Sequence, residues 1–175
     1  MKLAAARRAF SLIEVMLAVG IFAAAVVVTL AMLPALTRQS METADGLTAQ
    51  RLPDAIRVEL RRLAATGGFD TLVSTIQSMA APMPATLSLV GSRDGSILHS
   101  ENYLAPAAAA LLPEAERYFL IEVWRFSSGQ LAYDASGAVL PVYVRVSWPY
   151  RVPSSAATVA ASQRVQTDFT VTIMR

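Results

Sequence analysis

The chain has 175 residues, which is enough for one modest domain and one accessory element. Residues 1–9 carry three of the fifteen Lys and Arg residues and none of the thirteen Asp and Glu residues. The remainder is therefore almost neutral, and a bulk electrostatic case for nucleic-acid binding is absent. There is no cysteine, which excludes disulfides and thiolate metal sites but leaves both an exported and a cytosolic domain open.

A long apolar segment follows the basic N-terminus. Between Val15 and Leu33 there is no charged residue and no proline. A helix needs roughly 20 residues to cross the hydrocarbon core of a bilayer, so the sequence predicts a single membrane span. Because Lys2, Arg7 and Arg8 precede this span, the N-terminus is expected to be cytoplasmic and the rest of the chain to be exported.

Glu14 stands near the start of this apolar segment, in the stretch RRAFSLIEVMLAVGIF. An ionised carboxylate at the centre of a bilayer costs about 2.5–3.5 kcal/mol, and less near a helix end, where it reaches the interface. One interpretation is an uncleaved anchor with Glu14 at the membrane face. A second is a secretory signal peptide cut after Ala25, although the acid and the continuing apolar run argue against it.

The same stretch resembles the N-terminal signature of type IV pilins and of the pseudopilins of type II secretion. The resemblance covers about a tenth of the chain. It implies that a prepilin peptidase cuts after Ala9, removing the cytoplasmic leader 1–9, and that Phe10 becomes the N-methylated first residue. Glu14 would then be the fifth mature residue, as in the family. The family nearly always has Gly where this chain has Ala9.

The resemblance also implies a role in assembly. Residues 10–36 would form a transmembrane and assembly helix, and the Glu14 carboxylate of one subunit would pair with the Phe10 ammonium of its neighbour at low dielectric. The implied partners are the prepilin peptidase, other pilin or pseudopilin subunits, the inner-membrane assembly platform and the membrane itself. The implied location is the inner membrane, with a single pass and a periplasmic domain, and the pilus or pseudopilus after assembly.

A second helical pattern follows Pro34, a residue that would kink a helix. Its apolar positions lie on one face, and Gly67-Gly68 suits its end. The apolar positions are Leu52, Ile56, Leu60 and Leu63. Either one continuous spine or two helices with a break near Gly46 fits the pattern, and the resemblance favours the spine. A shorter helix is expected next, with one stripe formed by Phe69, Leu72, Ile76 and Met79.

Alternating patterns dominate the remainder of the chain. A hairpin is expected from 86–90 and 96–100, with turn chemistry between them, and 103–113 is either a short helix or a loop. The strongest predicted strands are 117–126, 142–148 and 164–173, the last two with one apolar and one polar face. An antiparallel sheet packed on the helical spine follows, which makes 37–175 an exported, pilin-like α+β domain.

No residue pattern points to catalysis, to a metal or to a cofactor. The only histidine, His99, lies in a predicted hairpin strand without a cluster of partners, so an exposed or hydrogen-bonded strand histidine is expected. The C-terminal loop 152–162 contains no carboxylate, so a calcium site found in some pseudopilins is not expected here. The resemblance to pilins implies a structural subunit, a minor pilin or pseudopilin, rather than an enzyme. The alternative is a membrane-anchored exported binding module that does not polymerise.

Overall fold

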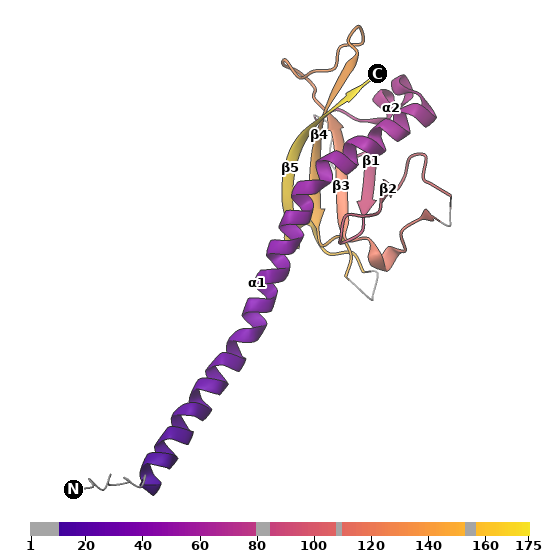
Figure 1. Ribbon diagram of the computed structural model, residues 1–175. Coiled ribbons are helices and arrows are strands. Elements are labelled where there is room, and N and C mark those ends of the chain that lie inside the picture. The colour runs from indigo at the N-terminus through magenta and orange to yellow at the C-terminus, as the bar shows by residue number, and fades with distance from the viewer. Residues whose placement is uncertain (1–10, 80–84, 108–109, 153–156) are drawn as a thin grey trace, which may run out of the picture. The chain divides into compact units, whose positions relative to one another are not determined.

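The computed structural model describes residues 11–79, 85–107, 110–152 and 157–175, and it divides the chain into two compact units, Met1–Ala44 and Asp45–Arg175 (Figure 1). Helix α1 belongs to both units, and all other elements belong to the second. In chain order the elements are α1 (Leu12–Gly67), α2 (Phe69–Thr75), β1 (Leu87–Gly91), β2 (Leu98–Ser100), the 3-10 helix η2 (Glu114–Glu116), β3 (Phe119–Arg125), β4 (Val139–Trp148), the 3-10 helix η3 (Ala161–Gln163) and β5 (Val165–Met174).

Helix α1 is one uninterrupted helix of 56 residues, so the continuous spine is confirmed and a break near Gly46 is excluded. Pro34 lies inside it, and the Thr37 hydroxyl donates hydrogen bonds to the carbonyls of Leu33 and Pro34 at 3.1 and 3.0 Å. The helix ends at Gly67 as predicted, because Gly68 has a φ of 87°, which favours glycine.

The strands form one antiparallel sheet with the order β2-β1-β3-β4-β5 (Figure 1). The predicted hairpin is confirmed, with Val90 of β1 opposite His99 of β2. The three strongest predicted strands are also confirmed, and β4 begins three residues earlier than expected, at Val139. In the described residues of 103–113 no α-helix is present; Ala110 is part of a 3-10 turn, in which its N–H donates to the Ala107 carbonyl over 2.8 Å, and residues 108–109 lie outside the described part of the chain.

The hydrophobic core lies between α1 and one face of this sheet, which confirms the α+β layout. Within the second unit α1 buries the predicted stripe and adds Ala49 to it, and every one of these residues is at most 1% exposed. The opposing side chains come from the alternate positions of four strands, as expected for a sheet covered on this face. They include Leu87, Leu89, Ile121, Val123, Val142, Val144, Val146, Val171 and Ile173.

Two details of the predicted core are wrong. The stripe of the short helix stops early, because α2 ends at Thr75; Ile76 stays buried, whereas Met79 is 42% exposed. The inner face of β5 is buried only in its second half. Val165 is 54% exposed, because β5 is an edge strand and the core built on α1 reaches Val171 but not Val165.

We expect Ile56→Ala to lower the free energy of unfolding by about 2–5 kcal/mol, because it empties a fully buried position on α1. The matched control is Val58→Ala on the same helix, where the side chain is 65% exposed and the change should stay within about 0.5 kcal/mol. Urea unfolding in detergent micelles, followed by the fluorescence of Trp124 and Trp148, measures both. Equal losses in the two variants would contradict this packing.

Candidate functional site

The N-terminal end of α1 carries a reciprocal capping arrangement between Ser11 and Glu14. The Ser11 hydroxyl accepts a hydrogen bond from the Glu14 backbone N–H at 3.3 Å, and the Glu14 carboxylate accepts one from the Ser11 backbone N–H, also at 3.3 Å. This is a capping box, in which the N-cap residue and the third helical residue satisfy each other's backbone donors. The S-x-x-E signature of a capping box is present in the sequence at Ser11–Glu14, so adjacent residues are enough to predict this arrangement.

The capping box gives the carboxylate a function within its own chain. A negative charge in the first turn also interacts favourably with the helix dipole. Of the three predicted site residues, only Glu14 can be placed, and its carboxylate lies at the N-terminal end of α1. Ala9 and Phe10 lie outside the described residues, so their predicted roles in cleavage and methylation are untested.

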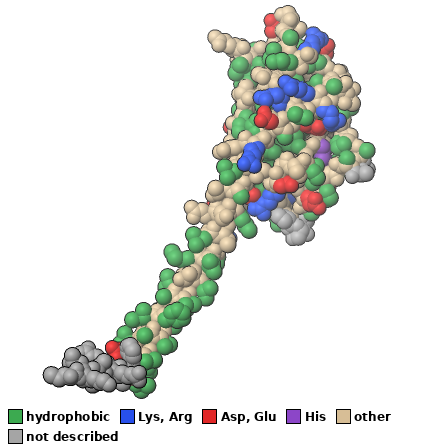
Figure 2. All heavy atoms as spheres, in the orientation of Figure 1, with side chains coloured by type: hydrophobic (Ala, Val, Ile, Leu, Met, Phe, Trp, Pro, Cys, Tyr) green, Lys and Arg blue, Asp and Glu red, His purple; other side chains and the backbone are tan. Residues whose placement is uncertain are grey.

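The first unit exposes a long apolar helical surface. Every described residue from Ser11 to Ala44 is exposed, and Figure 2 shows hydrophobic side chains along this part of the helix. The large side chains include Leu17, Ile21, Phe22, Val28, Leu30 and Leu33, which point in many directions around the helix rather than along one stripe. By length and composition α1 can cross a membrane, a test that a signal sequence near an N-terminus also passes.

A buried acidic residue marks the beginning of the second unit on α1. Asp45 is 7% exposed and accepts two hydrogen bonds from the guanidinium of Arg93, at 2.9 and 3.0 Å, in a bidentate ion pair. It also accepts a hydrogen bond from the Tyr118 hydroxyl at 2.6 Å, and the Arg93 guanidinium lies 4.9 Å from the centre of the Tyr118 ring. These three residues, the Asp45 cluster, join α1 to the β1–β2 turn and to the residue preceding β3.

The Asp45 cluster changes the titration of its tyrosine. Burial, and then the hydrogen bond to Asp45, raise the pKa of Tyr118 from 10.0 to about 12. Beside the cluster lies an open cavity of about 370 Å³, lined by Ser92, Arg93, Asp94, Ala115, Glu116 and Tyr118. The Ser92 hydroxyl in this lining donates to the Asp94 carboxylate, and none of the described lining residues carries an imidazole or an amine that could act as its base.

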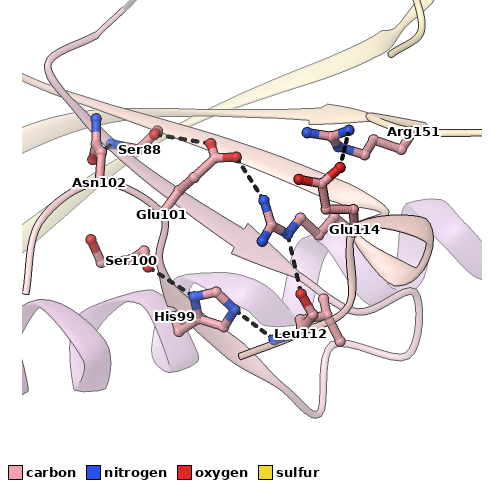
Figure 3. Close-up of polar contacts among 9 residues, drawn as sticks. Ser88, His99, Ser100, Glu101, Asn102, Leu112, Glu114 and Arg151 are labelled. Carbon is pink, nitrogen blue, oxygen red and sulfur yellow. Dashed lines mark hydrogen bonds and ion pairs between the residues drawn. The ribbon is translucent and has the colours of Figure 1, made fainter. Parts of the chain in front are cut away.

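His99 is the buried, hydrogen-bonded strand histidine that was one of the two expectations (Figure 3). Its Nδ1 donates to the Ser100 carbonyl over 2.8 Å, and its Nε2 accepts from the Leu112 backbone N–H over 2.9 Å. A carbonyl at one nitrogen and an N–H at the other define a neutral ring protonated at Nδ1. Because both nitrogens are engaged, His99 fastens the loop at Leu112 and leaves no lone pair for a ligand.

Charged residues near His99 also make contacts with the loop that contains Leu112 and Glu114 (Figure 3). Arg117 donates to the Leu112 carbonyl over 3.2 Å and pairs with Glu101 over 3.1 Å, while Arg151 pairs with Glu114 over 3.1 Å. Nowhere in the described part of the chain do three or more His, Cys, Asp or Glu side chains gather so that they could hold a metal ion.

The loop between β4 and β5, for which the sequence offered no disulfide or calcium site, is fastened around Tyr150. Its backbone N–H donates to the Tyr118 carbonyl over 2.7 Å, and its carbonyl accepts from the Val159 N–H over 2.9 Å. The guanidinium groups of Arg151 and Arg164 lie 5.3 and 5.1 Å from the centre of its ring, which is cation–π distance. Backbone hydrogen bonds and two cation–π contacts therefore hold the described ends of this loop in place without a disulfide.

No protein-family model, characterised protein or solved structure matches this chain. Its function must therefore be inferred from its residues and their geometry.

The raised pKa of Tyr118 predicts a pH dependence of stability. A raised folded-state pKa contributes stability that is fully present below pH 10 and is lost as the pH rises through about 12. We expect the free energy of unfolding to fall over this window, and to fall less in Tyr118→Phe. Urea unfolding at a series of pH values in detergent micelles measures this. The control is Tyr150→Phe, which removes the hydroxyl of a tyrosine that is not part of the Asp45 cluster. If the pH dependence of the unfolding free energy became equally weak in this variant, the role assigned to Tyr118 would be contradicted.

Proposed function

We propose that this chain is a prepilin-like structural subunit, a minor pilin or pseudopilin, that is stored in the inner membrane and assembled into a filament. The observation that carries the proposal is the division of α1. From Asp45 onwards the helix is covered by the sheet of its own domain, whereas the described apolar residues before it, from Leu12 on, are exposed. A bilayer and a bundle of identical helices are the two environments that such a surface fits.

The mechanism would be assembly rather than catalysis. In the membrane the apolar half of α1 is solvated by lipid, and in the filament it packs against the same segment of other subunits. Moving between these environments leaves apolar surface buried throughout, so register must come from a polar contact. Glu14 supplies the carboxylate for it, and the amine of Phe10, exposed after cleavage at Ala9, would supply the counter-ion in a neighbouring subunit.

A second candidate is a membrane-anchored exported binding module that does not polymerise. The capping box favours it, because Ser11 already gives Glu14 a structural role without any neighbour. The two candidates differ in what the negative charge of Glu14 does, since a capping box accepts Glu or Gln at this position whereas pairing with an ammonium needs the charge.

The first test is processing of the leader. After co-expression with a prepilin peptidase, mass spectrometry of the intact chain should show an N-terminus at Phe10 that carries one added methyl group. Ala9→Gly should be cut at least as completely, because it restores the family's usual residue, and Ala9→Leu should stay uncut. A chain that still starts at Met1, or that is cut after Ala25, would overturn the proposal.

The second test separates charge from capping at position 14. We expect Glu14→Gln and Glu14→Ala both to reduce the yield of sheared filaments, or of subunit–subunit cross-links, at least tenfold while insertion and cleavage continue. Glu42→Gln, which removes an exposed carboxylate further along α1, is the matched control and should assemble normally. Full assembly of Glu14→Gln would favour the anchored binding module instead.

A further inference from the structure

A small cavity lies at the C-terminal end of β3, far along the chain from the predicted assembly residues. It has a volume of about 180 Å³ and is lined by Ser78, Arg125, Phe126, Ser127, Ala132 and Tyr133, which we call the β3-end cavity. Two of its lining residues, Ser78 and Arg125, are held together by backbone pairing. The Arg125 N–H donates to the Gln77 carbonyl, and the Met79 N–H donates to the Arg125 carbonyl, both over 2.9 Å.

Three of the hydrogen-bond donors that line this cavity have no partner among the described residues. Arg125 and Tyr133 are half-buried and Ser127 is exposed, and none of the three side chains makes a hydrogen bond or ion pair with the part of the chain that the structure describes. Other half-buried arginines are paired. The side chains of Arg117 and Arg145 are 15% and 22% exposed, and each contacts a carboxylate at 3.1 Å.

The acidic residues nearby are engaged elsewhere. None of the described residues that line the β3-end cavity carries a carboxylate. Asp134 follows Tyr133, but its carboxylate accepts a hydrogen bond from the Ser136 N–H at 2.9 Å. Asp70 is held by Arg175, with nitrogen–oxygen distances of 2.6 and 2.8 Å. The cavity therefore combines a guanidinium and two hydroxyls without a counter-charge, a set that suits an anion.

Two aromatic side chains, Phe126 and Tyr133, line the β3-end cavity and limit the size of a ligand. The ring of Phe126 lies 6.5 Å from that of Tyr143, and the ring of Tyr133 lies 6.4 Å from that of Phe69, distances at which aromatic rings support each other. A cavity of this volume accommodates one small charged group rather than a large cofactor. We propose that the β3-end cavity binds a single oxyanion group, a carboxylate or a phosphate, through Arg125 with Ser127 and Tyr133.

The test uses the full-length chain in detergent micelles, labelled with ¹⁵N. Sodium acetate in one arm and sodium phosphate in the other replace sodium chloride at constant ionic strength and pH. We expect a saturable shift of the Arg125 Nε–H and Ser127 amide resonances in at least one arm, which also identifies the preferred anion. The absence of saturable shifts in both arms would overturn the proposal, whether or not the chain forms filaments.

Variants separate a built site from general attraction to positive charge. Arg125→Gln should weaken anion binding at least tenfold, and Arg125→Lys should weaken it less, because it keeps the charge but loses the fork. Arg61→Gln removes an exposed arginine of α1 as the matched control, and it should leave the affinity unchanged. Should Arg125→Gln fail to fold, Ser127→Ala on the exposed loop should still weaken binding several-fold. Unchanged affinity in Ser127→Ala and Arg125→Lys, or an equal loss in Arg61→Gln, would overturn the proposal.

Discussion

The structure depends on one hydrophobic contact, the burial of the second half of α1 against the inner face of the sheet. Ile56, Leu60 and Leu63 are completely buried there, and burying each large aliphatic side chain contributes about 1.5–3 kcal/mol. The extent of this contact is limited. The five-stranded sheet buries residues of α1 from Asp45 onwards, and the described residues of α1 before Asp45 are exposed. The other half of the same helix is more apolar, with no charged residue between Val15 and Leu33, and no residue of the described part of the chain covers it.

Charge is handled differently in the two units. In the second unit three buried or half-buried carboxylates have an arginine partner: Asp45 pairs with Arg93, Glu59 with Arg62 and Glu101 with Arg117. Among the described residues of the first unit, the Glu14 carboxylate accepts hydrogen bonds from the backbone N–H and the hydroxyl of Ser11 and makes no ion pair. A carboxylate that has hydrogen bonds but no counter-ion is stable at an aqueous interface, whereas moving it into hydrocarbon costs free energy. Whether Glu14 needs a cationic partner therefore depends on which of these environments surrounds it.

The local periodicity of apolar residues was enough to predict the helices and strands, but it did not predict the polar contacts between them. The apolar period of Leu52 to Leu63 and the alternation of β4 and β5 predicted the helix-on-sheet core correctly. Val165 was misplaced, because alternation cannot show where an edge strand extends beyond its cover. The Ser11–Glu14 capping box was readable from adjacent residues, whereas the contact between Asp45 and Tyr118 spans 73 positions and has no local signal. For the same reason, the lining of the β3-end cavity, which joins Ser78 with residues of 125–133, could not be predicted from the sequence.

The position of the Asp45 cluster has a mechanical consequence. Asp45 is the first residue of α1 to be buried, and its carboxylate is tied to the β1–β2 turn and to the residue preceding β3. Tension applied along the apolar part of the helix reaches this ion pair before it reaches any buried aliphatic side chain. Three hydrogen bonds would then be sheared together, so that the cluster would act as a clamp protecting the softer hydrophobic contacts behind it.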